Sequence, residues 1–67
     1  MKPYLLKAEM AKRGVKAKDL SDWLGVPKAG VYRRLNGQTK FSIDETNTLR
    51  IKLHLTADQT VRIFLED

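Results

Sequence analysis

The chain is expected to fold as an all-α protein, a compact bundle of about five short helices. Two observations predict this class. Apolar side chains recur at spacings of three and four residues, and helix-start and helix-stop signals divide the chain into short segments without an alternating stretch typical of a strand. Sixty-seven residues are enough for one small domain, so 1–67 is treated as a single unit of marginal stability.

The first helix is predicted from about Pro3 to Arg13. Proline suits the first turn, because it lacks an N–H group that a helix start would leave unpaired. Leu6 and Met10 fall on one face of this helix, one turn apart. Gly14 tolerates the left-handed backbone that ends many helices, so the helix is expected to end there.

The next two helices are predicted close together, over about Ala17–Leu24 and Lys28–Asn36. Gly25 permits an abrupt helix end, and Pro27 has the fixed φ that suits the start of a new helix. A tight corner at 25–27 is therefore expected. The apolar positions of both helices can then share one core: Leu20, Leu24, Val26, Val31 and Leu35.

Two capping boxes predict the last two helices. In each box, a Ser or Thr side chain accepts from the backbone N–H three residues later, and a Glu or Gln side chain reaches back. Ser42 with Glu45 is expected to begin a helix that runs to about Leu53. Thr56 with Gln59 is expected to begin the final helix.

Charge is distributed unevenly along the chain. The net charge is +5, but residues 1–40 carry ten basic and three acidic side chains, whereas residues 41–67 carry three basic and five acidic ones. Scattered lysines often do no more than solvate a surface. Here the positive half also contains the two helices around the 25–27 corner, which favours a footprint for a polyanion such as DNA.

Two short helices joined by a tight corner, the second with a basic outer face, are typical of a DNA-binding helix-turn-helix spanning about 17–36. At about 100° per residue from inward-facing Val31, the outer face of the second helix centres on Ala29, Arg33 and Asn36. The side chains best placed to contact base edges are Lys28, Ala29, Tyr32 and Arg33. Tyr32 has a second interpretation, as a half-buried ring that packs on the preceding helix.

Phosphate contacts are expected around this helix. Lys16 and Lys18 lie near the start of the first helix of the pair, where unpaired N–H groups commonly face a phosphate. Arg34 lies on the flank of the second helix and is expected to pair with an acidic neighbour or a phosphate. Asn36 can act as a turn residue at the helix end.

The segments Asp19-Leu20-Ser21, Leu24-Gly25-Val26, Val31 and Leu35-Asn36-Gly37 resemble the Cro/repressor helix-turn-helix family of phage and plasmid regulators. The resemblance covers nearly the whole chain and implies a lambda-repressor-like DNA-binding fold. It departs at three positions: Lys16 replaces a usual Ser or Thr cap, Ala17 a common Gln, and Pro27 a common Ser or Thr. The resemblance implies base contacts from Lys28, Ala29 and Arg33, and phosphate contacts from Asn36, Gln38 and Lys40.

The expected function is sequence-specific binding of double-stranded DNA, by a Cro-like repressor that blocks transcription from a two-fold symmetric operator. The alternative is a protein-interaction module that binds a partner repressor or a toxin, for which the second helix should expose more apolar area. Enzymatic activity and a cofactor are not expected, because the lone His54 has no Cys or second His beside it. Without cysteine or a long apolar run, the chain is expected in the cytoplasm of a bacterial cell and not in a membrane.

Assembly is also expected, because one recognition helix covers only a few base pairs. If Val61, Phe64 and Leu65 form the inner stripe of the last helix, Ile63 lies about 160° from Leu65 and points outward. Such a residue is either an ordinary isolated surface side chain or part of an interface. The hypothesis is that Ile63 joins a weak two-fold homodimer contact that is completed on DNA.

Overall fold

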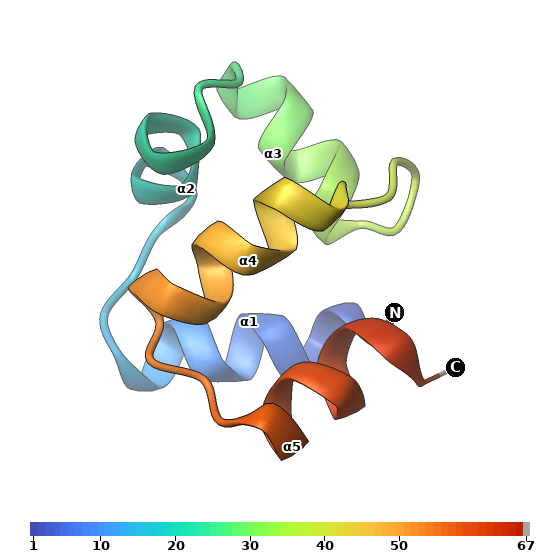
Figure 1. Cartoon of the computed structure of the whole chain (residues 1–67). Helices are drawn as coiled ribbons and strands as arrows, with labels where there is room; N and C mark the ends of the chain where they lie inside the picture. The colour runs from blue at the N-terminus through green and yellow to red at the C-terminus, as the bar shows by residue number, and fades with distance from the viewer. Residues whose placement is uncertain (67) are drawn as a thin grey trace.

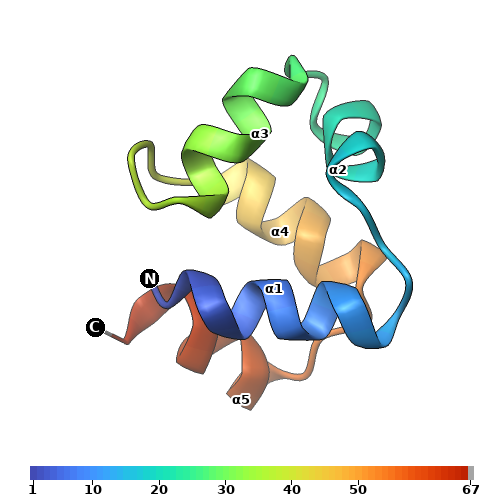
Figure 2. The same ribbon diagram turned by 180° about the vertical axis from the view of Figure 1, so that it is seen from behind.

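The computed structural model describes residues 1–66 and is all-helical over that range, which confirms the predicted fold class. The helices are α1 (Pro3–Lys12), α2 (Ala17–Leu24), α3 (Lys28–Leu35), α4 (Ile43–Lys52) and α5 (Ala57–Thr60), and α5 continues as a π-helical turn (Val61–Leu65). Figure 1 shows α2 and α3 at one end and α1 beside the C-terminal segment at the other, with α4 between them. The reverse view shows the same order, with both termini on one side (Figure 2). Among these helices, none is both long and apolar enough to cross a membrane.

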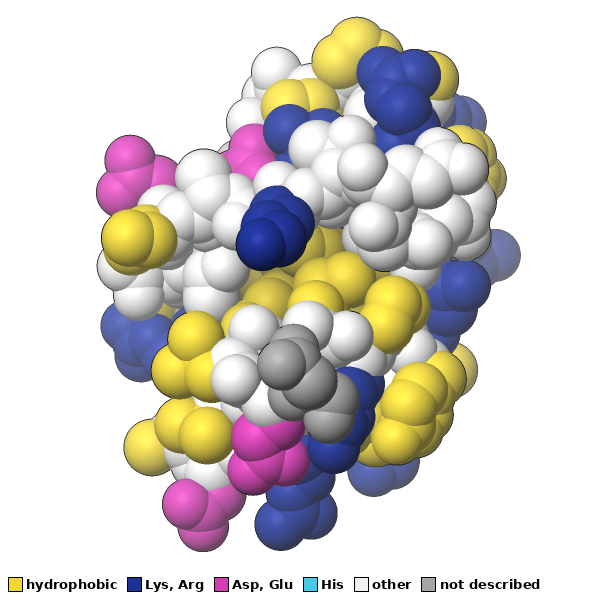
Figure 3. Space-filling view, turned by 90° about the vertical axis from the view of Figure 1, so that its right-hand side faces the viewer, with side chains coloured by type: hydrophobic (Ala, Val, Ile, Leu, Met, Phe, Trp, Pro, Cys, Tyr) yellow, Lys and Arg dark blue, Asp and Glu magenta, His cyan; other side chains and the backbone are white. Residues whose placement is uncertain are grey.

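The core is formed by apolar side chains from α1, α2, α3 and α4, from the residues just after α4, and from the π-helical turn. The buried apolar residues are Leu6, Met10, Leu20, Val31, Leu35, Leu49, Leu53, Leu55 and Ile63. The predicted inward positions Leu6, Met10, Leu20, Val31 and Leu35 are therefore confirmed, whereas Leu24 and Val26 are only partly buried and pack against this core. Apolar surface is not fully covered, however, and Figure 3 shows hydrophobic side chains lining a hollow on the face where the termini lie.

Both predicted capping boxes are present. Glu45 N–H donates to Ser42 Oγ at 3.1 Å, and Ser42 N–H donates to Glu45 Oε1 at 3.0 Å. At the start of α5, Gln59 N–H donates to Thr56 Oγ1 at 3.1 Å and Thr56 N–H donates to Gln59 Oε1 at 2.9 Å. These local bonds account for helix starts that agree with the sequence signals.

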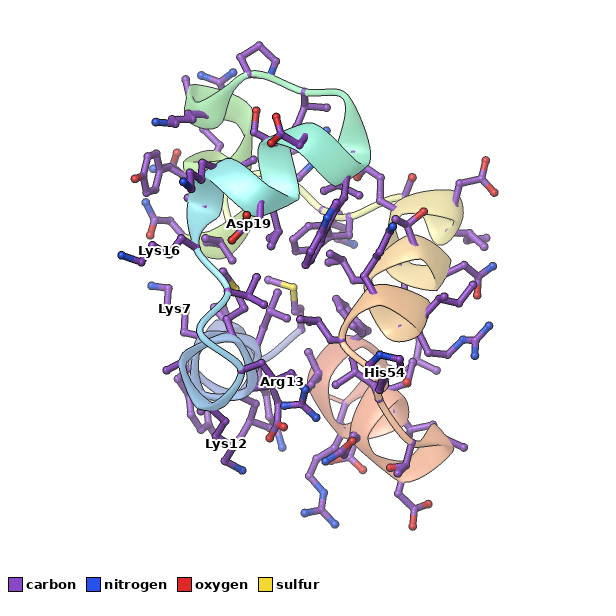
Figure 4. The ribbon with its side chains drawn as sticks, turned by 90° about the vertical axis from the view of Figure 1, so that its left-hand side faces the viewer. Lys7, Lys12, Arg13, Lys16, Asp19 and His54 are labelled. Atoms are coloured by element: carbon purple, nitrogen blue, oxygen red, sulfur yellow. The ribbon has the colours of Figure 1, made fainter. Side chains whose placement is uncertain are left out.

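The end of α4 is held by two basic side chains. Arg13, just after α1, donates from Nε to the Leu53 carbonyl at 2.6 Å and from Nη1 to Glu9 Oε1 at 2.6 Å. Figure 4 shows Arg13 directed from α1 toward the α4 end. Its hydrogen bond lowers the pKa of Glu9, against the opposing effect of burial.

Lys52 Nζ lies 5.9 Å from the ring centre of half-buried Trp23, which ties α4 to α2.

The predicted orientation of the last helix is wrong. Ile63 is 2% exposed and belongs to the core, whereas Val61 and Leu65 are exposed. The Lys2 N–H donates to the Ile63 carbonyl at 2.8 Å, which docks the π-helical turn against the start of α1 and turns Ile63 inward. Ile63 is therefore not available for a dimer interface, and that hypothesis is withdrawn.

His54 ends α4 with a backbone conformation that favours glycine. Its φ is +54°, while the Leu55 N–H donates to the Arg50 carbonyl at 2.9 Å and the His54 N–H to Ile51 at 3.2 Å. This is the Schellman pattern, in which a left-handed residue follows the helix. A side chain with a Cβ is disfavoured there by about 1–2 kcal/mol.

We therefore predict that His54→Gly raises the free energy of unfolding by about 1 kcal/mol, measured by chemical denaturation. His54→Ala is the matched control, because alanine keeps the Cβ and should give no such gain. An equal increase in both variants would show that loss of the imidazole, and not relief of the backbone, is responsible.

Candidate nucleic-acid interface

The corner between α2 and α3 is closed by short local bonds. Gly25 has a φ of +66°, and its N–H donates to the Ser21 carbonyl at 2.9 Å. Ser21 Oγ donates to the Val26 carbonyl at 2.5 Å, so the serine side chain bridges the turn. Pro27 then precedes α3 in an extended conformation. Figure 1 shows the two helices crossing steeply, which leaves one side of α3 uncovered.

The sequence predicts unpaired backbone N–H groups at the start of α2, but one N–H group at this helix start is paired in the structure. The side chain of Lys16 cannot accept a hydrogen bond, but the Lys16 N–H donates to Asp19 Oδ2 at 2.9 Å. The carboxylate therefore takes one N–H and offsets the positive end of the helix dipole. An anion near this end would be attracted mainly by the exposed side chains of Lys16 and Lys18.

The outer side of α3 carries the residues predicted to contact bases. Lys28, Ala29 and Arg33 are exposed, and Tyr32 is 53% exposed. Gly30, Val31 and Leu35 are buried on the opposite side. The helix phase expected from the sequence is confirmed.

The two adjacent arginines of α3 have different environments. Arg33 is exposed and makes no side-chain hydrogen bond or ion pair within residues 1–66. Arg34 donates from Nε to Glu45 Oε1 at 3.0 Å and from Nη2 to Glu45 Oε2 at 3.2 Å, and from Nη1 to the Gly30 carbonyl at 2.9 Å. The expected pairing of Arg34 with an acidic neighbour is confirmed.

Glu45 is thus shared between α3 and α4. Partial burial would raise the pKa of its carboxyl, but hydrogen bonds from Arg34 and from the Ser42 N–H outweigh burial and lower it. Gly30 leaves the space this arrangement needs, because a Cβ there would lie 3.1 Å from Arg34 Nη1. The result is a bidentate ion pair between Arg34 and Glu45, which fixes the inner flank of α3 to the start of α4.

A notch of about 350 Å³ lies between α1, the start of α2 and the second half of α3. It brings together three predicted site residues, Lys16, Tyr32 and Asn36, over a floor that includes Met10 and Leu35. Tyr32 lines the notch and about half of the residue is exposed, so its side chain is partly packed and partly open to solvent.

Lys7 on α1 lines the same notch, and the sequence analysis missed it. Figure 4 shows Lys7 and Lys16 on one edge of the molecule, directed away from His54 and Arg13. The sequence contains no signal for this placement. It follows only from how α1 packs against α3.

The remaining predicted phosphate contacts lie outside the notch. Gln38 and Lys40 are exposed in the loop after α3, where the Gln38 N–H donates to the Arg33 carbonyl at 2.9 Å. Lys18 is exposed on α2 but does not line the notch. The structure therefore groups Lys16 with Asn36, and places Gln38 and Lys40 beyond the end of α3.

The candidate interface consists of hydrogen-bond donors and positive charges around one exposed helix. Within residues 1–66, no group of three or more His, Cys, Asp or Glu side chains is arranged to hold a metal ion. Comparison of the chain with protein-family models, with curated proteins and with solved structures found no match.

Proposed function

We propose that this protein binds double-stranded DNA sequence-specifically, with α3 in the major groove, and represses transcription in the manner of a Cro-like regulator. The main support is the contrast between the two sides of α3. The inner flank is held by Arg34 and the core, whereas Lys28, Ala29 and Arg33 face outward without structural partners among the described side chains. A helix presented in this way can enter a groove without disturbing its own support.

The outward side chains have the chemistry of base recognition. The guanidinium of Arg33 can donate two parallel hydrogen bonds to O6 and N7 of guanine, and Ala29 can contact the methyl group of thymine. Lys28 and Tyr32 flank these two and can donate to base edges or to the backbone. Base identity would then be determined mainly over a few base pairs.

Phosphate contacts would come from both edges of α3. Lys7, Lys16 and Asn36 surround the notch on one edge, and Gln38 and Lys40 follow the end of the helix. Lys18 adds a further positive charge on α2. Lysines placed in this way neutralise phosphates and position the protein without selecting a sequence.

The exposed apolar residues support DNA over the alternative of a partner-protein module acting through α3. The most exposed large ones are Ile43 at 82% and Leu65 at 75%, neither of which is on α3, and within residues 1–66 the exposed large apolar side chain on α3 is Tyr32, which carries a polar hydroxyl. An α3 that docked on a protein would be expected to carry such side chains itself.

Selection of bound sequences from a pool of random DNA duplexes tests the proposed function. We expect enrichment of a two-fold symmetric operator with a guanine within each half-site. A pool that remains random after repeated rounds at low salt would contradict the proposal.

The notch gives a separate prediction. Lys7→Ala should weaken binding to specific and random DNA by a similar factor and reduce the slope of log affinity against log salt by about one unit. Lys12→Ala is the matched control on the same helix, because Lys12 Nζ pairs with Glu9 Oε2 at 3.2 Å and points away from the notch (Figure 4). An unchanged salt slope for Lys7→Ala would remove this residue from the interface.

A further inference from the structure

The carboxylate of Glu45 connects the start of α4 to the inner flank of α3. Its Oε1 accepts from the Ser42 N–H at 3.0 Å and from Arg34 Nε at 3.0 Å, and its Oε2 accepts from Arg34 Nη2 at 3.2 Å. Arg34 extends this connection, because its Nη1 donates to the Gly30 carbonyl in the first turn of α3 at 2.9 Å. The start of one helix is therefore bonded to the backbone of the other through two side chains.

The ion pair is largely enclosed by the protein. The side chains of Arg34 and Glu45 are 16% and 17% exposed. An exposed ion pair contributes little, because water and mobile side chains weaken it. An enclosed arginine that bonds both oxygens of one carboxylate instead holds a defined geometry.

The position of the pair allows it to set the rotation of α3 about its own axis. Packing of Val31 and Leu35 holds the inner side of α3, but apolar contacts have no preferred direction, whereas hydrogen bonds do. Arg33 and Arg34 are adjacent, so their side chains leave the helix about 100° apart. When the bonds to Glu45 fix Arg34 on the inner flank, they also fix the direction in which Arg33 leaves the helix.

We propose that Glu45 is a positioning residue for base recognition, which orients Arg33 through Arg34 without contacting DNA itself. The inference rests on the proposed DNA-binding function. A forked donor can bond two acceptors on one base edge only when its plane and direction fit that edge. Phosphate contacts carry no such sequence information and are less sensitive to a small rotation of the helix. Loss of the Glu45 carboxylate should therefore reduce selectivity between sequences more than affinity for the DNA backbone.

A glutamine at position 45 removes the ion pair and keeps the helix cap. The start of α5 already uses this residue type, since the Thr56 N–H donates to Gln59 Oε1 at 2.9 Å. Glu45→Gln can keep the bond from the Ser42 N–H in the same way. Its Nε2 then takes the place of Oε2 opposite Arg34 Nη2, so that two donors face each other and the bidentate pair is lost.

Glu9→Gln is the matched control. Glu9 Oε1 also accepts from an arginine, Arg13 Nη1 at 2.6 Å, but this pair lies at the end of α1 and not on α3. Both variants remove one negative charge from a carboxylate that is paired with arginine, so the general attraction to DNA should increase equally in both. A difference between the two variants then reports on the orientation of α3.

The first measurement is the ratio of affinities for the selected operator and for random duplex, at a temperature at which a thermal melt shows the proteins to be folded. Glu45→Gln should lower this ratio about tenfold, and Glu9→Gln should leave it unchanged. A merely structural role would reduce the folded fraction and weaken binding to both duplexes alike. An unchanged ratio for Glu45→Gln would overturn the inference.

The second measurement is a double-mutant cycle with Arg33→Ala. Arg33 and Glu45 share no hydrogen bond or ion pair among residues 1–66. If Glu45 acts by orienting Arg33, Glu45→Gln should change the affinity ratio by no more than about twofold once residue 33 is alanine. A tenfold loss in both backgrounds would show that Glu45 acts independently of Arg33 and would contradict the proposal.

Amide hydrogen exchange of the free protein separates this inference from the proposed function. The α3 amides should exchange faster in Glu45→Gln than in the wild type and in Glu9→Gln, because α3 opens locally more often without its bonds to α4. If the wild type binds no DNA, the proposed function fails, and hydrogen exchange alone decides whether Glu45 holds α3. Unchanged exchange of the α3 amides in Glu45→Gln would show that it does not.

Arg34→Lys replaces Glu45→Gln in these measurements if the glutamine variant does not fold. Lysine keeps the positive charge beside Glu45 but lacks the planar fork that bonds both carboxylate oxygens. The same loss of the affinity ratio is expected, with the same faster exchange of the α3 amides. A wild-type ratio in Arg34→Lys would overturn the inference.

Discussion

Replacing Leu35 by alanine is expected to lower the free energy of unfolding by about 2–5 kcal/mol. Leu35 is 5% exposed and joins the inner side of α3 to the core that contains Leu20 and Val31. Alanine would leave a cavity beside the notch, and the surrounding helices could fill it only in part. Because domains of this size have little stability to spare, much of the protein should be unfolded at 37 °C, as measured by a thermal melt.

Leu65→Ala is the control for this prediction. It removes the same atoms from a side chain that is 75% exposed, so stability in dilute protein should change by no more than about 0.5 kcal/mol. If Leu35→Ala melted near the wild-type temperature, the assignment of Leu35 to the supporting side of α3 would be wrong in energetic terms.

Arg33→Ala is expected to weaken binding to the best operator by about 1–3 kcal/mol and to relax the preference at one base position. The physical reason is loss of a forked donor that can bond two acceptors on one base edge. Arg33 is exposed and lacks an ion pair within residues 1–66, so the melting temperature should stay near that of the wild type. Affinity measured against a panel of single-base operator variants checks both statements.

The neighbouring Arg34→Ala variant should behave in the opposite way. It removes the bonds to Glu45 and to the Gly30 carbonyl, so its main effect should be a loss of stability of about 1–3 kcal/mol. Equal losses by Arg33→Ala on operator and random DNA would assign Arg33 to phosphate and not to a base. Arg33→Lys keeps the charge without the fork and should recover only the non-specific part of the affinity.

The bounds of the helices could be predicted closely because their signals are local. The boxes at Ser42 and Thr56 lie within four residues of the helix starts that they define. The predicted limits of α2, from Ala17 to Leu24, coincide with those in the structure. In α3 only one side is apolar, so Val31 and Leu35 fixed which side turned inward.

The wrong and missing predictions concern residues whose positions depend on contacts between segments that are far apart in the sequence. The apolar residues of the last helix allow more than one of its faces to turn inward. The backbone hydrogen bond between Lys2 and Ile63 selects the face that contains Ile63, which the apolar pattern alone does not favour. Lys7 reaches the notch only because α1 lies beside α3. Arg13 binds the Leu53 carbonyl across 40 residues of sequence, so its role could not be inferred from either helix alone.

The bond between Arg34 and Glu45 also has a consequence for evolvability. The Arg34–Glu45 bonds fix α3 through its inner flank. A substitution on the outer face therefore removes no side-chain hydrogen bond or ion pair among the described residues; this face carries Lys28, Ala29 and Arg33. Under the proposed function, a lineage carrying this fold could therefore change its preferred operator one amino acid at a time while each intermediate stays folded. The same separation makes these three positions suitable for a randomised library, in which new binding specificities could be sought on an unaltered scaffold.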